Sequence, residues 1–246
     1  MSTFTKTTTV ADQAGAEAAG LKWLANATEE AAAHVVEVVG VNGNQLMEKR
    51  VETVLPDQES AFEFGRVLRG IHEAGADAFG APPEGWNGKN YIGRIEQSCI
   101  PQESWVEFYT EQRVLPFARQ ANLRPDILEA VEKACENIVK HADAPEFNVK
   151  PARIHGDLWA GNVLFGPDGV VMIDPAAHGG HPHTDLAMLE LFGTPHLVDM
   201  LAGYGNPDVD FALHQLHPLA VHAMTHGLAY HRALGDAAHQ VLTRFS

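Results

Sequence analysis

A polar loop set between short apolar runs most constrains how this chain can fold. Asp157 and Asn162 are separated by four residues, and Asp174 ends the next apolar stretch. The neighbouring apolar segments have the length of short strands, and a Gly-Pro-Asp-Gly sequence between two of them is typical of a hairpin turn. Those segments are 152–154, 163–165 and 170–173, with the turn at 166–169. The ends of these strands should therefore bring the three polar side chains to one point.

This spacing suits ATP-dependent phosphoryl transfer. In protein kinases the catalytic loop reads His-x-Asp-x-x-x-x-Asn, and a later Asp completes the metal site. Asp157 is predicted to be the base that accepts the proton of an attacking hydroxyl. Asn162 and Asp174 offer hard oxygen ligands to magnesium. The alternative is a polar loop whose Asp and Asn only cap turns, but the spacing and the second strand pair favour catalysis.

The residues around this loop resemble the fructosamine (ketosamine) kinase family, within the aminoglycoside phosphotransferase and protein-kinase-like superfamily. The resemblance rests on His-Gly-Asp-Leu-Trp-Ala-Gly-Asn-Val at 155–163, on Ile-Asp-Pro-Ala at 173–176, and on the segment 184–193. It continues through shorter matches at 91–93, 105–109 and 112–116. It implies an α+β, protein-kinase-like fold of two lobes, with a small β lobe and a mainly helical large lobe, and it implies ATP and Mg2+ as cofactors.

The resemblance places the ATP-binding lysine and its partner near the start of the chain. Lys6 ends a segment that resembles the lysine-bearing strand, and Glu17 lies in one that resembles the helix whose Glu pairs with it. Relatives have two strands and a glycine-rich turn before this lysine, whereas five residues precede Lys6 here. We therefore expect a truncated small lobe over 1–52, containing a lysine strand, a helix and a hairpin, and a helical large lobe over 53–246.

Further site residues follow from the same resemblance. Met47, Glu48 and Arg50 fall where relatives have the hinge whose backbone contacts adenine. His155 and Asp185 are expected to support the catalytic loop.

Two residues are candidates for the acceptor side of the site. Trp159 is interpreted either as loop core or as a wall of a sugar pocket, and we favour the pocket. His178 begins a His-rich segment, 178–183, just beyond Asp174. That segment is expected to be a polar loop facing the substrate, with a transition-metal site as the alternative.

Local patterns predict the remaining elements. Helices are expected over 11–27 and 57–74, with strands over 34–40 and 45–51 joined by an Asn-Gly turn. The Pro- and Gly-rich segment 80–100 is expected to be a loop. Long helices should cover 102–121 and 125–141, and the chain should be mostly helical from 184 onward.

Composition restricts the partners. The chain of 246 residues has 17 basic and 32 acidic residues, for a net charge of −15, which argues against a nucleic-acid partner. The same charge would attract an amine-bearing substrate, or it could simply keep the protein in solution. Cys99 and Cys135 form neither a zinc motif nor a disulfide framework. With no apparent signal peptide and no apolar stretch long enough to span a membrane, a cytoplasmic protein is expected.

These observations predict an ATP-dependent kinase that phosphorylates a sugar hydroxyl of small-molecule or protein-bound ketosamines, a deglycation repair reaction. The alternatives are another amino-alcohol kinase of the aminoglycoside or choline type, and a pseudokinase or binding module that lacks activity because the phosphate-covering strands are absent. The Thr-rich strand at 4–8 is also expected to pair with a second copy at the sheet edge, giving a homodimer.

Overall fold

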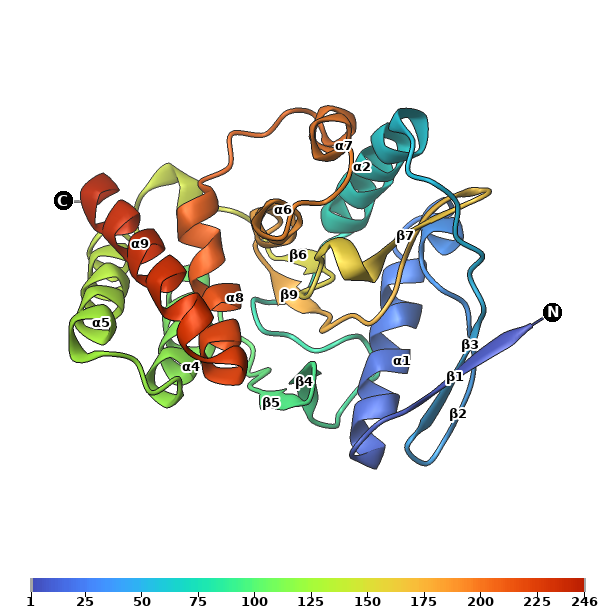
Figure 1. The fold of residues 1–246 in the computed structure, drawn as a ribbon, viewed down its shortest axis with the longest axis horizontal. Helices are drawn as coiled ribbons and strands as arrows, with labels where there is room; N and C mark the ends of the chain where they lie inside the picture. Colours follow the sequence, from blue (N-terminus) through green and yellow to red (C-terminus); the bar gives the residue numbers. More distant parts are fainter. Residues whose placement is uncertain (1, 246) are drawn as a thin grey trace.

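The computed structural model describes residues 2–245, which form a small β lobe and a larger, mainly helical lobe (Figure 1). The small lobe is an antiparallel sheet with the order β1-β3-β2, and α1 packs on it. A tight turn joins β2 to β3 at Gly43, whose φ of 59° suits glycine. The elements are β1 (Thr3–Thr7), α1 (Ala11–Ala25), η1 (Ala31–His34), β2 (Val38–Asn42) and β3 (Gln45–Lys49).

The three-stranded sheet agrees with the prediction, except that the strand expected from residue 34 begins at Val38. Residues 31–34 form a 3-10 turn instead. The reason is tertiary: the His34 ring is buried and its Nδ1 atom lies 2.8 Å from the carbonyl oxygen of Val170 in the large lobe. This contact turns the chain before the strand can start.

The rest of the chain builds three short strand pairs and the helices around them. The α2 helix begins after Asp57, whose carboxylate accepts a hydrogen bond from the Ser60 N–H at 2.9 Å. The elements are α2 (Gln58–Glu73), β4 (Asn90–Ile92), β5 (Ile95–Gln97), α3 (Trp105–Glu107), η2 (Phe108–Val114), α4 (Leu115–Gln120), α5 (Pro125–Lys140), η3 (Pro145–Phe147), β6 (Ala152–Ile154), η4 (Ala160–Asn162), β7 (Val163–Gly166), β8 (Gly169–Met172), β9 (His178–Gly180), α6 (His183–Leu191), α7 (Leu197–Tyr204), α8 (Phe211–His226) and α9 (Leu228–Arg244).

The short strands around Asp157 and Asp174 form two antiparallel pairs. β7 and β8 make the predicted hairpin, and β6 pairs with β9, which follows Asp174. The segment 80–100 is not the expected loop throughout, because β4 and β5 form a short hairpin within it. Its strands are only three residues long, too short for composition to reveal among the surrounding prolines and glycines.

The helix predicted over 102–121 contains a π-helical turn, η2, between α3 and α4. Pro116 has no N–H to donate to the carbonyl of Gln112, which interrupts the α-helical ladder there. Within this turn, the side chains of Gln112 and Arg113 donate hydrogen bonds to the backbone carbonyls of Ile100 and Ser98, at 2.8 and 2.7 Å. The turn thereby ties this helix to the end of the β4–β5 hairpin.

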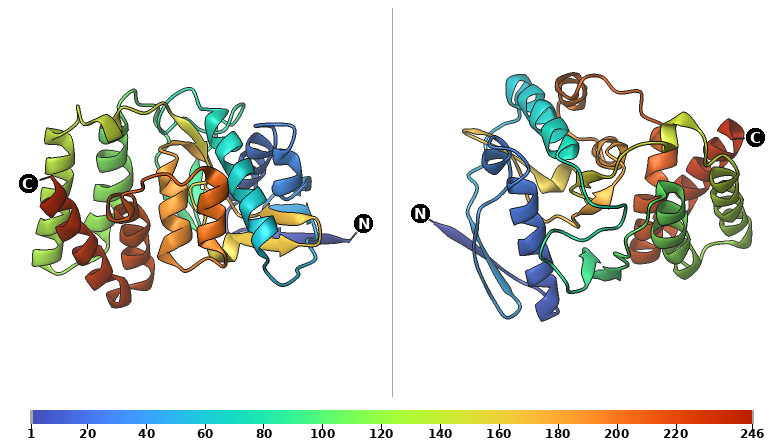
Figure 2. Two further views of the ribbon diagram at one scale, coloured as in Figure 1. Left: turned by 90° about the horizontal axis from the view of Figure 1, so that it is seen from above. Right: turned by 180° about the vertical axis from the view of Figure 1, so that it is seen from behind.

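Two hydrophobic clusters hold the molecule together. The first joins α1 and β3 to α2 and the β7–β8 hairpin, with Leu46, Phe64 and Met172 fully buried. The second lies among α4, α5, α8 and α9, at the end of the molecule opposite β1 (Figure 2). The boundary between the two lobes that was expected at residue 52 stays a prediction. The first cluster contains side chains from both sides of that residue. Within residues 2–245, no helix has the length and apolar character needed to cross a membrane.

Candidate active site

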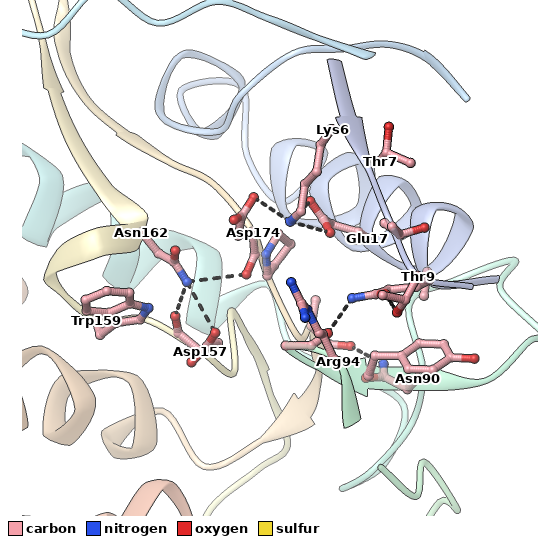
Figure 3. Close-up of a pocket in the computed structure, with 17 residues that line it drawn as sticks. Lys6, Thr7, Thr9, Glu17, Asn90, Arg94, Asp157, Trp159, Asn162 and Asp174 are labelled. Atoms are coloured by element: carbon pink, nitrogen blue, oxygen red, sulfur yellow. Dashed lines mark hydrogen bonds and ion pairs between the residues drawn. The ribbon is translucent and has the colours of Figure 1, made fainter. Parts of the chain in front are cut away.

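The loop between β6 and β7 brings Asp157 and Asn162 into contact (Figure 3). It leaves β6 at Ile154 and returns to β7 through the short turn η4. The Nδ2 atom of Asn162 donates to the backbone oxygen of Asp157 at 2.8 Å, to its carboxylate at 3.3 Å, and to the backbone oxygen of Asp174 at 3.4 Å. Because the amide nitrogen is used in this way, the amide oxygen is the atom of Asn162 left to bind a cation.

Buried groups fix the backbone of this loop. Asp185 accepts hydrogen bonds from the N–H of His155 at 2.7 Å and of Gly156 at 2.9 Å. Its third partner is His72, whose Nε2 lies 3.1 Å away. Burial alone would raise the pKa of Asp185, but the hydrogen bond and charge of His72 and the contacts of His155 hold it below its usual value. The carboxylate thus stays ionised beneath the loop.

His155 and Gly156 shape the same turn. Burial lowers the pKa of His155, so its ring is neutral. Its Nδ1 accepts from the Asp157 N–H at 3.2 Å, and its Nε2 donates to the Ile173 oxygen at 2.9 Å. Gly156 has a φ of 80°, and a Cβ atom there would come within 2.5 Å of the Ala176 oxygen. Only glycine fits this position. Both His155 and Asp185 therefore lie where support of the loop was expected.

Lys6, on β1, lies opposite the loop that carries Asp157 and forms two ion pairs. Its Nζ atom is 2.9 Å from Glu17 Oε2 and 3.0 Å from Asp174 Oδ1. Burial of the Lys6 ammonium alone would lower its pKa, but the charges of Glu17 and Asp174 outweigh this and raise it. The lysine is thus held charged, and its position is set by Glu17 of α1 and by Asp174, two residues after the end of β8.

Three carboxylates surround this one ammonium. Oxygens of Glu17, Glu48 and Asp174 all lie within 4.8 Å of one another. Burial raises the pKa of both glutamates to about 7, against the opposing effect of Lys6. Glu48 Oε1 has no hydrogen-bond partner among the described residues. These carboxylate oxygens, gathered at one place, are the kind of hard ligand that a divalent cation such as magnesium prefers.

A cavity of about 310 Å³ joins the two halves of the site. It is lined by Lys6, Glu17 and Asp174 on one side and by Asp157, Asn162 and Trp159 on the other. Burial, followed by the charge of Asp174, raises the pKa of Asp157 to about 8. A carboxyl with such a pKa is matched to proton transfer near neutral pH.

Trp159 lines the cavity, and its role as a wall of a sugar pocket stays a prediction. It is 40% exposed, and its ring meets that of Phe192 edge-on, with 5.9 Å between the ring centroids.

The structure does not bring His178 to the pocket, which corrects the expectation of a substrate contact. His178 is only 2% exposed. It lies on β9, where its Nε2 accepts from Arg113 at 3.3 Å and its Nδ1 donates to the Ala176 oxygen at 2.7 Å. The segment 178–180 pairs with β6 rather than forming a polar loop, because strand pairing buries it.

The rest of the His-rich segment is also turned inward. Nitrogen atoms of His181, His183 and His214 lie within 4.8 Å of one another. However, His181 already uses both ring nitrogens: Nδ1 accepts from the His183 N–H at 3.1 Å, and Nε2 donates to the Glu146 oxygen at 3.2 Å. A metal would have to displace one of these bonds.

The expected hinge contacts also need correction. β3 is the central strand, so the backbones of Met47 and Glu48 pair with both β1 and β2 and are not free for adenine. Met47 lies opposite Thr5, on the face away from Lys6, whereas Glu48 shares the face of Lys6. Arg50 begins the extended link to α2 and stacks on Phe4, 5.8 Å from the ring centroid, outside the cavity that Lys6 and Asp157 line.

The sequence reasoning missed a third wall of the cavity. The β4–β5 hairpin contributes Asn90, Tyr91, Gly93 and Arg94, and the start of α1 contributes Gln13. A partial signal existed, because the match at 91–93 lies in this hairpin. The hairpin itself was not recognised.

Comparisons with known proteins agree with this geometry. The fructosamine kinase family model matches residues 3–206. A probable ketoamine kinase from Vibrio vulnificus is 33% identical over 144 residues, covering 56% of this chain and 46% of that protein. The ketosamine-3-kinase of Mus musculus is 31% identical over 155 residues, covering 61% and 48%. The chain spans about half the length of the curated relatives it matches.

Solved structures extend the similarity to nearly the whole chain. The crystal structure of a candidate fructosamine-3-kinase from Thermobifida fusca is 40% identical with a TM-score of 0.87, and the match covers 98% of this chain and 85% of that one. Aminoglycoside phosphotransferases and choline kinases share the fold at much lower identity. The predicted α+β, two-lobed kinase-like fold is therefore confirmed.

Proposed function

The chain belongs to the fructosamine kinase family, and from that premise we propose that it is an ATP-dependent kinase that phosphorylates a sugar hydroxyl of ketosamine adducts. The supporting observation is that one cavity joins two halves of a phosphotransfer site. Lys6, paired with Glu17 and Asp174, faces Asp157 and Asn162 across that cavity. The phosphorylated adduct would then decompose and release the amine, which is deglycation repair.

Each residue has a role in this proposal. Asp157 accepts the proton of the acceptor hydroxyl as its oxygen attacks the γ-phosphorus, and ADP leaves with the electrons of the broken P–O bond. Lys6 holds the α- and β-phosphates, and Glu17 fixes Lys6. Asn162 and Asp174 would hold magnesium, which neutralises charge on the phosphates.

Two observations favour this function over the alternatives. Asp157, Asn162 and Asp174 are all present and the Lys6–Glu17 pair is formed, which favours an enzyme over a nucleotide-binding module without activity. The mouse relative is named for a ketosamine acceptor, which favours that acceptor over choline or an aminoglycoside.

The acceptor and the compartment are part of the same proposal. The acceptor is a small-molecule or protein-bound ketosamine, whose amine the net charge of −15 would attract. Cys99 and Cys135 are unpaired, and burial raises the pKa of the Cys135 thiol to about 12. Unpaired, protonated thiols suit the reducing cytoplasm.

A panel of acceptors tests this function. The protein is incubated with Mg·ATP and fructosyl-lysine, choline or an aminoglycoside, and phosphate esters are followed by mass spectrometry. A phosphate ester on fructosyl-lysine supports the proposal. Transfer only to choline or to the aminoglycoside favours the other amino-alcohol kinases. Nucleotide binding without transfer to any acceptor favours the binding module.

A further inference from the structure

The tip of the β4–β5 hairpin aims one arginine into the cavity. β4 and β5 are joined by two residues, Gly93 and Arg94. Gly93 has a φ of 55°, a conformation that glycine adopts without strain and that a two-residue hairpin turn requires. Arg94 lines the cavity, and its guanidinium points into the space between Lys6 and Asp157 (Figure 3).

The hairpin is anchored to the elements that carry the catalytic residues. Asn90 Nδ2 donates to the Ala177 oxygen at 3.0 Å, three residues after Asp174. Gln97 Nε2 donates to Asn90 Oδ1 at 2.9 Å, and both side chains are buried. At the tip, the side-chain amide of Gln13 in α1 donates to the Gly93 oxygen. Arg94 is therefore held at a fixed place relative to α1 and Asp174, although its own side chain is exposed.

Among the described residues that line the cavity, Arg94 is the cation that has no carboxylate partner. Among the described residues that line the cavity, Lys6 and Arg94 carry the positive charges. Lys6 is engaged by Glu17 and Asp174. Within residues 2–245 no hydrogen bond or ion pair is formed by the Arg94 side chain, whereas Lys89 on the same hairpin pairs with Glu96 at 2.7 Å.

We propose that Arg94 contacts the γ-phosphoryl group of the bound nucleotide and stabilises it during transfer. This inference rests on the proposed kinase function. The transferred group must lie between the hydroxyl held by Asp157 and the phosphates held by Lys6, and Arg94 points into that space. A guanidinium presents a fork of donors that matches phosphate oxygens. An arginine supplied in the same chain performs this task in other phosphotransfer enzymes.

Nucleotide binding tests the contact without any acceptor. Calorimetry compares Mg·ADP, which lacks the γ-phosphate, with the Mg complex of a non-hydrolysable ATP analogue. Arg94→Ala should weaken binding of the analogue about 10- to 100-fold, the equivalent of one lost charged hydrogen-bond pair, and leave ADP binding unchanged. Arg94→Lys should fall between. Lys89→Ala, an exposed cation of the same hairpin outside the cavity, is the matched control and should bind both ligands as the wild type does.

Three results would overturn the inference. Arg94→Ala could bind both nucleotides as the wild type does while phosphate transfer continues, which removes Arg94 from the site and leaves the kinase function standing. The variant could instead raise KM only for acceptors that carry a carboxylate, which would make Arg94 a contact for the acceptor. A wild-type protein that binds neither nucleotide overturns the proposed function and this inference together. Thermal melting of each variant checks that the fold is intact.

Discussion

At the scale of single residues, burial shifts the pKa values of two ionisable groups in opposite directions. Asp157 has its pKa raised to about 8 by burial and by Asp174. His178 has its pKa lowered to about 3 by burial and by the Arg113 cation. Both shifts come from removing a charged form from water, but in opposite directions because one group is an acid and the other a base.

Asp157→Asn should abolish most of the turnover. The amide cannot accept the proton of the attacking hydroxyl, so we expect a loss of about 10²-fold or more in ATP-dependent phosphorylation of a fructosyl amine. Asp168→Asn is the matched control, since Asp168 lies exposed in the β7–β8 turn. Full activity in the Asp157 variant would show that another group acts as the base.

His178 should make the protein sensitive to acid. Its folded pKa of about 3 lies below the ordinary value of 6.5, so its contribution to stability is present above pH 6.5 and is lost as the pH falls toward 3. Between pH 6.5 and 5 the loss amounts to at most about 2 kcal/mol.

Denaturant unfolding at several pH values measures this contribution. His178→Gln should lose less stability than the wild type on acidification, whereas the exposed His239→Gln should follow the wild type. Parallel curves for all three proteins would contradict the assignment to His178.

At the scale of elements, the β4–β5 hairpin depends on buried hydrogen bonds rather than on strand length. Its strands have three residues each, so pairing alone is marginal. Asn90 connects it both to Gln97 and to the Ala177 oxygen. These contacts link the third wall of the cavity to the side that carries Asp174.

Asn90→Ala should loosen this wall. Removing the amide leaves the Ala177 oxygen and the Gln97 side chain buried without a partner, a cost of roughly 1–3 kcal/mol. Amide hydrogen exchange should become faster in residues 90–97 before the rest of the chain responds. Lys89→Ala, which removes only an exposed ion pair, should leave both measurements unchanged. Equal exchange rates in both variants would contradict the role of Asn90.

At the scale of the whole molecule, the cleft between the lobes concentrates negative charge. Glu17, Glu48 and Asp174 crowd around Lys6, and the phosphates of ATP add further negative charge. We therefore expect ATP binding to depend strongly on magnesium. Calorimetry with and without a chelator tests this, and tight binding in the absence of metal would contradict it.

The outer strand of the small lobe suggests a self-association contact. Within residues 2–245, β1 pairs only with β3, and Thr3, Phe4 and Thr5 are exposed along it. Such an edge can pair with a second copy, so the homodimer remains a prediction. Light scattering over a concentration series should show a dimer that Thr7→Pro dissociates. Val39→Pro, in the bulge of β2 at the opposite edge, is the control. A monomer at every concentration would rule the contact out.

The sequence by itself indicated the loop in which we propose that the base and metal ligands lie. Asp157, Asn162 and Asp174 lie within one short stretch between strands, so their spacing along the chain already limits their spacing in the fold. Family resemblance added Lys6 and Glu17, and the structure brings them together at 2.9 Å. The α2 helix was also readable, because Phe64, Val67, Leu68 and Ile71 recur with the helical period and form its buried face.

Tertiary structure alone decided the rest. Glu48 faces Lys6 and Met47 faces away because β3 pairs with β1 in one particular register, and a shift by one residue would exchange the two side chains. His178 is buried because its strand pairs with β6. Arg94 reaches the cavity only because Gln13 and Ala177, each 80 or more residues away, hold its hairpin. Contacts between such distant residues leave no periodic pattern in the sequence, so only the folded chain reveals them.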